Sequence, residues 1–146
     1  MSAPSDQDLS RREEISISGA AMSSAPWGAA AITGAVVGAA DLALHGTSIG
    51  VAAFSGSVAF GASVFLVVAA AGALWRARSG RAARWARANP WRFAILPGVA
   101  AAVIALVLTV VTGGGVLEGF LSGLWHGGAV FGLTGAIGAV GKSRRD

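Results

Sequence analysis

The sequence VAAAVIALVLTVV, residues 99–111, decides the class of fold, because Thr109 is its only polar residue and none is charged. It lies inside a longer uncharged run, residues 93–117. A helix of about 20 apolar residues crosses the roughly 30 Å hydrocarbon core of a bilayer. We therefore predict a membrane-spanning helix over residues 92–112.

The composition of the whole chain agrees with a membrane location. Of its 146 residues 54% are hydrophobic and 12% are charged, whereas a soluble domain carries about 25% charged residues. So few charges do not cover a globular surface in water, which excludes an ordinary soluble enzyme, and so much apolar surface excludes an intrinsically disordered chain. The absence of cysteine excludes a disulfide-stabilised secreted domain. An integral membrane protein with a single domain remains.

Three further uncharged runs have the length of a membrane span, namely residues 15–40, 42–75 and 119–141. Pro26 and Trp27 suit the first turn of a helix at the headgroup level. We therefore predict an all-α bundle of four transmembrane helices within residues 26–141. The predicted spans are residues 26–44, 50–75, 92–112 and 117–140. Around them we expect a flexible polar tail over residues 1–25, a basic loop over residues 76–91 and a basic tail over residues 142–146.

The distribution of basic residues predicts the orientation of this bundle. Lys and Arg gather in residues 11–12, 76–92 and 142–145, and the connections 45–49 and 112–116 contain none. Positively charged segments stay on the cytoplasmic side of a membrane. We expect a multi-pass protein of the cell membrane with both termini and the basic loop in the cytoplasm. Four spans are preferred to three, because an even number returns every basic segment to one side.

Glycine, with 22 copies, marks the helix faces that we expect to pack. Small residues four positions apart form a flat face on which a second helix approaches closely, and lipid supplies no hydrophobic drive to replace that contact. The candidate packing residues are Gly34, Gly38, Gly115, Gly119, Gly123 and Gly127. Two uses of these faces are open: packing within one chain, and self-association into a homo-oligomer.

Ionisable residues in or near the predicted spans are functional candidates, because charge is costly in a bilayer. They are Asp41, His45, Glu118 and His126. The first three lie near span ends, whereas His126 lies about 12 Å deeper than Glu118 along the same helix. For His126 we expect a neutral ring bonded to a neighbouring helix, with a pore-lining role as the alternative. Acid–histidine pairs are one route to a metal site or a proton relay, but no known metal motif has this spacing, so we predict no metal.

The basic loop carries the candidate residues for contact with phosphate or lipid, which are Arg76, Arg78, Arg81, Arg84, Arg87 and Arg92. On a helical wheel Trp85 shares one arc with alanines, and three of the arginines take the other. This pattern is typical of a segment in the headgroup plane with its tryptophan in the lipid. The arginines suit anionic membrane lipid, and direct contact with DNA is an open alternative.

Motifs for catalysis are missing from the sequence. It has no glycine-rich phosphate loop after a strand, no Ser/His/Asp or Cys/His arrangement, and no cysteine for redox or zinc chemistry. We therefore predict no enzymatic activity and no cofactor.

The chain resembles the small membrane plasmid-spread (Spd) proteins of actinobacterial conjugative plasmids. The likeness lies in the Ala/Gly/Arg-rich composition, as in RARSGRAARWAR over residues 76–87, in the small size and in the glycine-rich spans. The resemblance implies a part in conjugative plasmid transfer, in the spread of the plasmid into neighbouring compartments of the recipient. A mechanism consistent with the sequence is a homo-oligomer built on the glycine faces. Its basic loop would engage the DNA translocase, other plasmid-transfer membrane proteins, the DNA itself or anionic lipid. No individual residue is carried over from the family.

Two other classes of function stay open. One is a small channel or transporter that uses Glu118 and His126 in a pore. The other is an accessory subunit of a larger membrane complex, which would copurify with its partner.

Overall fold

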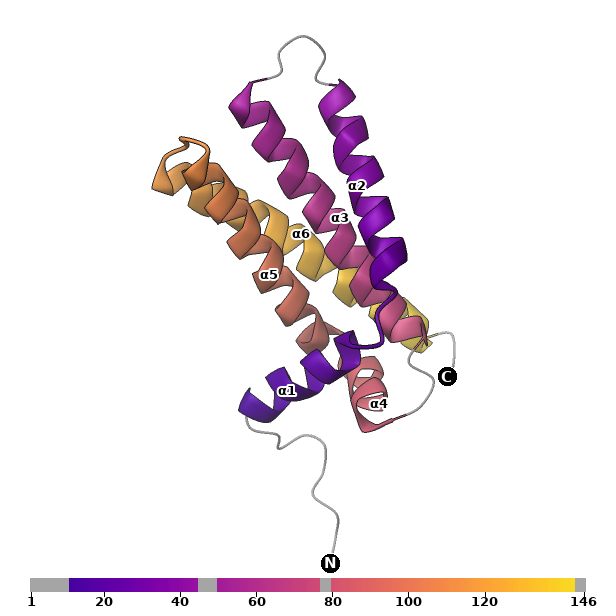
Figure 1. Ribbon diagram of the computed structural model, residues 1–146. Helices are drawn as coiled ribbons and strands as arrows, with labels where there is room; N and C mark the ends of the chain where they lie inside the picture. Colours follow the sequence, from indigo (N-terminus) through magenta and orange to yellow (C-terminus); the bar gives the residue numbers. More distant parts are fainter. Residues whose placement is uncertain (1–10, 45–49, 77–79, 144–146) are drawn as a thin grey trace, which may run out of the picture.

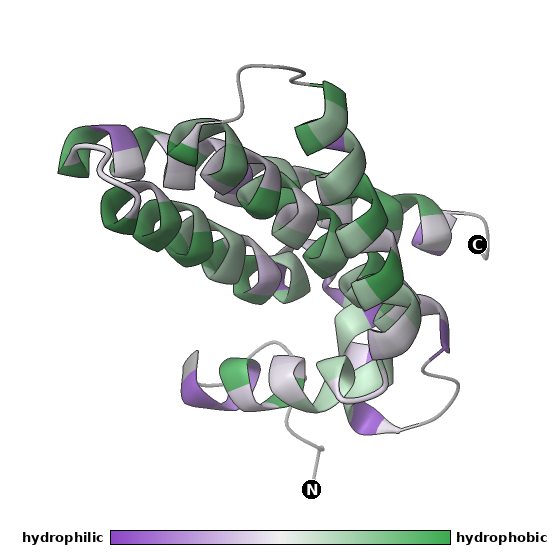
Figure 2. Cartoon of the chain, turned by 45° about the horizontal axis from the view of Figure 1, so that its top comes forward, coloured by the Kyte–Doolittle hydropathy of each residue, from purple (hydrophilic) through white to green (hydrophobic). Residues whose placement is uncertain are grey.

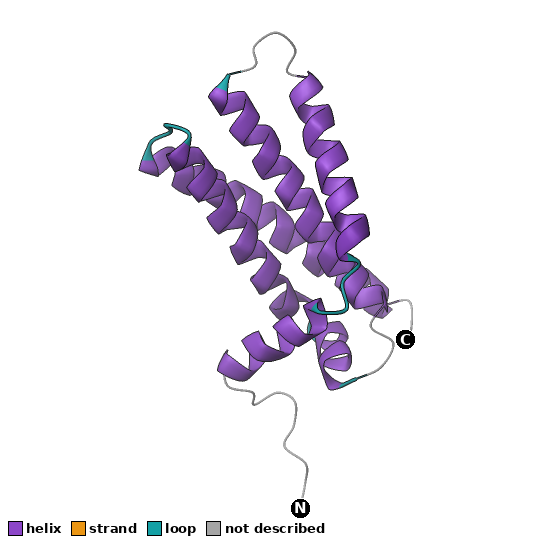
Figure 3. Ribbon diagram, in the orientation of Figure 1, coloured by secondary structure: helices purple, strands orange, loops and turns teal. Residues whose placement is uncertain are grey.

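The computed structural model describes residues 11–44, 50–76 and 80–143, and these form six helices and no strand (Figures 1 and 3). The helices are α1 (Arg11–Met22), α2 (Trp27–Leu44), α3 (Val51–Arg76), α4 (Arg81–Ala88), α5 (Pro90–Val111) and α6 (Val116–Ser143). By length and composition, α2, α3, α5 and α6 are able to cross a membrane. The all-α prediction is confirmed, and these four long apolar helices occupy the predicted ranges, with each of their boundaries within three residues of its prediction.

The four long helices form two hairpins, α2–α3 and α5–α6, that lie side by side (Figure 1). Helix α3 also packs against α5 and α6, whereas α2 contacts α3 alone among the described helices. Helix α3 therefore joins the two hairpins. Large apolar side chains on the free faces are exposed, as expected of helices that face lipid. They include Ile32, Val36, Val99, Val103 and Val107, and Figure 2 shows the long helices mostly in the colours of apolar residues.

Both hairpins are held together by direct backbone contact at glycines. A Cβ atom at Gly34 would lie 2.7 Å from the carbonyl oxygen of Gly61, and a Cβ at Gly123 would lie 2.7 Å from that of Ala102. Similar close approaches occur at Gly38, Gly119 and Gly127. Packing within one chain therefore accounts for five of the six predicted glycines. Gly115 differs, because it lies in the turn before α6 and a Cβ there would meet nothing within 4 Å.

Helices α1 and α4 lie across one end of the bundle, where α2 and α5 begin and α3 and α6 end (Figure 1). We call this the basic end. It carries Arg76, Arg81, Arg84, Arg87, Arg92 and Lys142. The opposite end, where Asp41 and Glu118 lie, is called the acidic end.

Helix α1 corrects the prediction of a flexible tail over residues 1–25. Ser18, Ala21 and Met22 are buried, and the last two join Trp85 and Phe93 in an apolar cluster at the basic end. The helix forms because Ile17 and Ala21, four positions apart, present one apolar side to the bundle. Acidic residues in its first turn also favour the positive end of the helix dipole.

Candidate functional site

The acidic end contains a polar cleft between α3, α5 and α6. Its volume is about 320 Å³. The polar side chains that line it are Ser55, Thr109, Thr112, Glu118 and Ser122. Glu118 extends from the first turn of α6, and the carboxylate lies beside Gly114 in the turn that joins α5 to α6. The sequence singled out Glu118, and the fold surrounds it with hydroxyl groups.

The hydroxyl groups of this cleft present oxygen lone pairs. Ser55 donates its proton to the carbonyl of Ala52 at 2.9 Å, and Thr109 donates to that of Ala105 at 2.9 Å. Thr112 likewise donates to its own helix. A hydroxyl that donates to its own backbone keeps its acceptor capacity for another partner. Together with the Glu118 carboxylate, the cleft therefore suits a cation or a proton rather than an anion.

His126 lies two turns beyond Glu118 on the same side of α6, with Ser122 between them. Its Nδ1 is 2.9 Å from the carbonyl oxygen of Ser122, four residues earlier on the same helix. We expected a bond to a neighbouring helix, and this expectation was wrong. A proton on Nδ1 makes this contact a hydrogen bond and leaves Nε2 as an acceptor. Glu118, Ser122 and His126 thus form a polar series along α6. The series ends one turn further on, where Val130 is 1% exposed and packs with Leu66 and Ala101.

Asp41 lies on the other side of α3 and takes no part in this cleft. The hydroxyl of Ser57 donates to Asp41 Oδ2 at 2.7 Å, which ties α2 to α3 just beyond the glycine contact. His45 lies outside the described residues. Within residues 11–44, 50–76 and 80–143, no three His, Asp or Glu side chains gather as they would around a metal ion. The three candidates that the structure describes, Asp41, Glu118 and His126, are therefore not brought into one metal site.

The basic end displays arginines on a helix whose other side is buried. Arg81 and Arg84 on α4 are exposed, and Trp85, in the neighbouring arc that it shares with alanines, is 3% exposed. The amphipathic helix expected from the sequence is present, but the expected insertion of Trp85 into lipid was wrong. Helix α1 covers this side of α4, so the indole packs against protein. Arg76 is exposed, and Arg78 lies outside the described residues.

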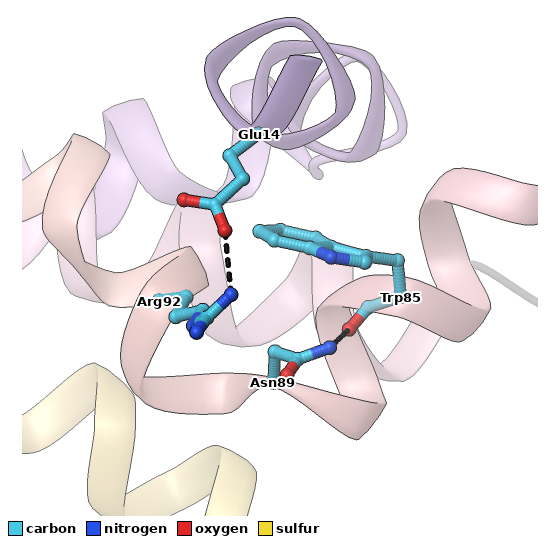
Figure 4. Close-up of polar contacts among 4 residues, drawn as sticks. All are labelled: Glu14, Trp85, Asn89 and Arg92. Carbon is cyan, nitrogen blue, oxygen red and sulfur yellow. Dashed lines mark hydrogen bonds and ion pairs between the residues drawn. The ribbon is translucent and has the colours of Figure 1, made fainter. Parts of the chain in front are cut away.

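Two contacts fix α4 and α1 at the start of α5 (Figure 4). Arg92 donates from Nη1 to Glu14 Oε1 at 2.6 Å, and Asn89 donates from Nδ2 to the carbonyl of Trp85 at 3.2 Å. The ion pair joins α1 to α5, so Arg92 is occupied by a partner within the chain. The role of Glu14 was missed, because residues 1–25 were interpreted as a tail. Ser57 was also missed, since a lone serine inside an apolar span gives no sign of its partner.

Comparisons of the chain with protein-family models, with curated proteins and with solved structures find no match. The functional argument therefore depends on the chemistry of the two ends of the bundle.

Proposed function

We propose that this chain is a multi-pass protein of the cell membrane, with both termini in the cytoplasm, that acts in conjugative plasmid transfer. In this role it helps the plasmid to spread between compartments of the recipient. The resemblance in composition, size and glycine-rich spans supports the biological setting. The observation that carries the proposal is the basic face of α4, which the fold holds in a fixed position.

The fixed position matters for binding. A free arginine loop loses conformational freedom when it binds, and this lost freedom weakens the complex. Trp85 buried at the basic end and the Asn89 bond keep α4 ordered before any partner arrives. Arg81 and Arg84 thereby form a surface for phosphate groups or for acidic residues. Its partners in this proposal are anionic lipid, other plasmid-transfer membrane proteins, the DNA translocase or DNA itself.

Self-association remains part of the proposal, but through other faces than those predicted. The glycines at 34, 38, 119, 123 and 127 lie against the neighbouring helix of the same hairpin, within one chain. A homo-oligomer would therefore use free surfaces, such as the side of α6 that carries Gly128 and Gly132, where a Cβ would meet nothing within 4 Å. Cross-linking in native membranes with these two glycines changed to leucine tests this face. Unchanged cross-linking would exclude it.

Deletion of the gene from its replicon, followed by measurement of mating frequency and of the transfer-zone diameter, tests the role in spread. We expect a smaller zone at near-normal frequency. Complementation with Arg81→Gln/Arg84→Gln should leave the zone small, and the charge-matched control Arg81→Lys/Arg84→Lys should restore it at least in part. An unchanged zone in the deletion strain would contradict the proposal.

The cleft at the acidic end favours a second candidate function, transport of a proton or a small cation. Glu118 and the hydroxyl acceptors supply its binding chemistry, and His126 continues the polar series toward the centre of the bundle. Proteoliposomes should then show a cation or proton flux that Glu118→Gln abolishes. Asp41→Asn, the same charge change on the other side of α3, should keep the flux. The absence of flux above that of empty liposomes would exclude this function.

A further inference from the structure

Two adjoining clefts open at the basic end. The smaller lies between the ends of α3, α4 and α6, and the larger lies between the end of α4, the start of α5 and the end of α6. Their volumes are about 240 and 530 Å³, and both are lined by Ala88 and Lys142. They lie apart from the exposed arginines of α4, because neither Arg81 nor Arg84 lines them. The position at the end of the long helices places them at the level where lipid headgroups meet the protein.

The charge of these clefts is entirely positive. Arg87 and Lys142 line the smaller cleft, Lys142 and Arg92 line the larger one, and no Asp or Glu lines either. Arg92 is paired with Glu14, so Arg87 and Lys142 are the cations left to attract an anion. Asn89 and Ser143 add groups that donate hydrogen bonds. The clefts therefore select a negatively charged group with several acceptor oxygens.

One donor in this region lacks a partner. The Nε atom of Arg87 is buried and has no hydrogen-bond partner among the described residues. A buried donor without a partner costs about 1–3 kcal/mol, and such groups are rare in folded proteins. Arg87 lines the smaller cleft, so a small turn of its side chain toward a phosphate there would satisfy this donor. The N-terminus of α5 adds to this chemistry, because Asn89 provides no side-chain cap and Pro90 opens the helix, so first-turn N–H groups face outward.

The walls of the clefts also match a lipid. Trp75 and Trp91 line the smaller and the larger cleft respectively, and they are 66% and 48% exposed. Tryptophan is enriched where headgroups meet hydrocarbon. Leu74 and Ile137 continue the smaller cleft as an apolar wall, which suits an acyl chain. A polynucleotide has no acyl chain that would pack against this apolar wall.

We propose that the clefts form a specific binding site for the headgroup of an anionic phospholipid, with Arg87 and Lys142 holding the phosphate. Basic pockets between transmembrane helices are a recurrent way to hold such headgroups. The site requires only that the bundle is embedded in a bilayer, and it is independent of any part in plasmid transfer. Bound lipid at this position would also link α4 to α6.

Native mass spectrometry of the full chain in mild detergent, with phosphatidylglycerol or phosphatidylcholine added, tests the site. We expect the chain to retain phosphatidylglycerol in preference to phosphatidylcholine. Arg87→Gln/Lys142→Gln should weaken retention about tenfold or more, since each charge-assisted bond is worth more than a neutral one. The control Arg12→Gln removes an exposed charge on α1 at the same end, outside both clefts and outside the basic face of α4, and should retain the lipid. Equal loss in both variants, or equal retention of both lipids, would overturn the proposal.

Two further measurements keep the result interpretable. Lys142→Gln alone changes an exposed side chain, so it should weaken retention without lowering the unfolding temperature in detergent; unchanged retention in this variant contradicts the role of Lys142. Competitors identify the source of the phosphate. Retention that persists with millimolar inorganic phosphate or an oligonucleotide supports the lipid, whereas displacement by either one overturns it in favour of free phosphate or nucleic acid.

Discussion

Two neighbouring glycines on α6 test how this bundle is held together. Gly127 faces α5, where a Cβ would lie 2.7 Å from the Cβ of Ala102 and 2.8 Å from the carbonyl oxygen of Gly98. Gly128 faces away, and a Cβ there would meet nothing within 4 Å. Gly127→Ala and Gly128→Ala therefore add the same methyl group, one residue apart, to opposite environments.

The expected magnitude follows from these distances. Carbon atoms in contact prefer a separation of about 3.5–4.0 Å, so Gly127→Ala forces α5 and α6 about 1 Å apart at this point. Overpacking of this kind costs about 1–3 kcal/mol. Replacement of a helical glycine by alanine also favours the helix by roughly 0.5–1 kcal/mol, but this gain is common to both variants. The difference between them therefore isolates the contact and should be about 1–3 kcal/mol.

Reversible unfolding in mixed detergent micelles, followed by tryptophan fluorescence or circular dichroism, measures this difference. We expect Gly128→Ala to be as stable as the natural chain or slightly more stable, and Gly127→Ala to unfold at lower denaturant. Equal midpoints for the two variants would refute backbone contact between α5 and α6. The same contact explains why leucine at Gly119 or Gly123 is a poor test of self-association, since it would disrupt the single chain first.

Three further predictions concern the basic end and the α2–α3 contact. Trp85→Ala should cost about 3–5 kcal/mol, because it empties the space between α1 and α4; denaturant unfolding measures the loss, and a loss below about 1 kcal/mol would contradict the burial. Glu14→Gln should lower stability by less than about 1 kcal/mol, since the pair with Arg92 is partly exposed, and the effect should shrink as salt rises from low to high concentration. Ser57→Ala should cost about 0.5–1.5 kcal/mol, and a double-mutant cycle with Asp41→Asn should give a coupling energy well above zero.

The four long helices were predictable because the sequence contains four charge-free runs of the length that a bilayer span needs. That length is about 20 residues. The partners of each helix were less predictable. Glycine spacing indicates which face of α2 or α6 is flat, but it does not reveal that Gly34 meets Gly61 or that Gly127 meets Gly98. Those pairings depend on the register of the two helices within each hairpin, which no local pattern encodes.

Helix α1 was not predicted because contacts with the rest of the bundle stabilise it, and its own sequence gives little sign of a helix. Its serines and charges are typical of a tail, and only a few side chains, such as Ile17 and Met22, contact the bundle. The same error affected Trp85, since a tryptophan beside a basic helix face indicates contact with lipid unless another segment covers it. At the acidic end, the sequence singled out Glu118 and His126 as separate ionisable candidates on one helix. The hydroxyl partners from α3 and α5 come from distant parts of the chain and needed the fold.

Between the acidic and the basic end lies an apolar layer of the bundle, and it bears on the choice between the proposed functions. The polar series Glu118–Ser122–His126 stops at Val130, which packs with Leu66 and Ala101 in the middle of the bundle. No acceptor on these three side chains is available to a cation, and an unhydrated charge in such a layer is costly. Transport through this chain therefore requires α3, α5 and α6 to separate at their closest contacts, against the backbone packing at Gly98, Gly123 and Gly127. A protein that presents a fixed basic surface to lipid or to a partner needs no such movement, and for this reason we rank that role above transport.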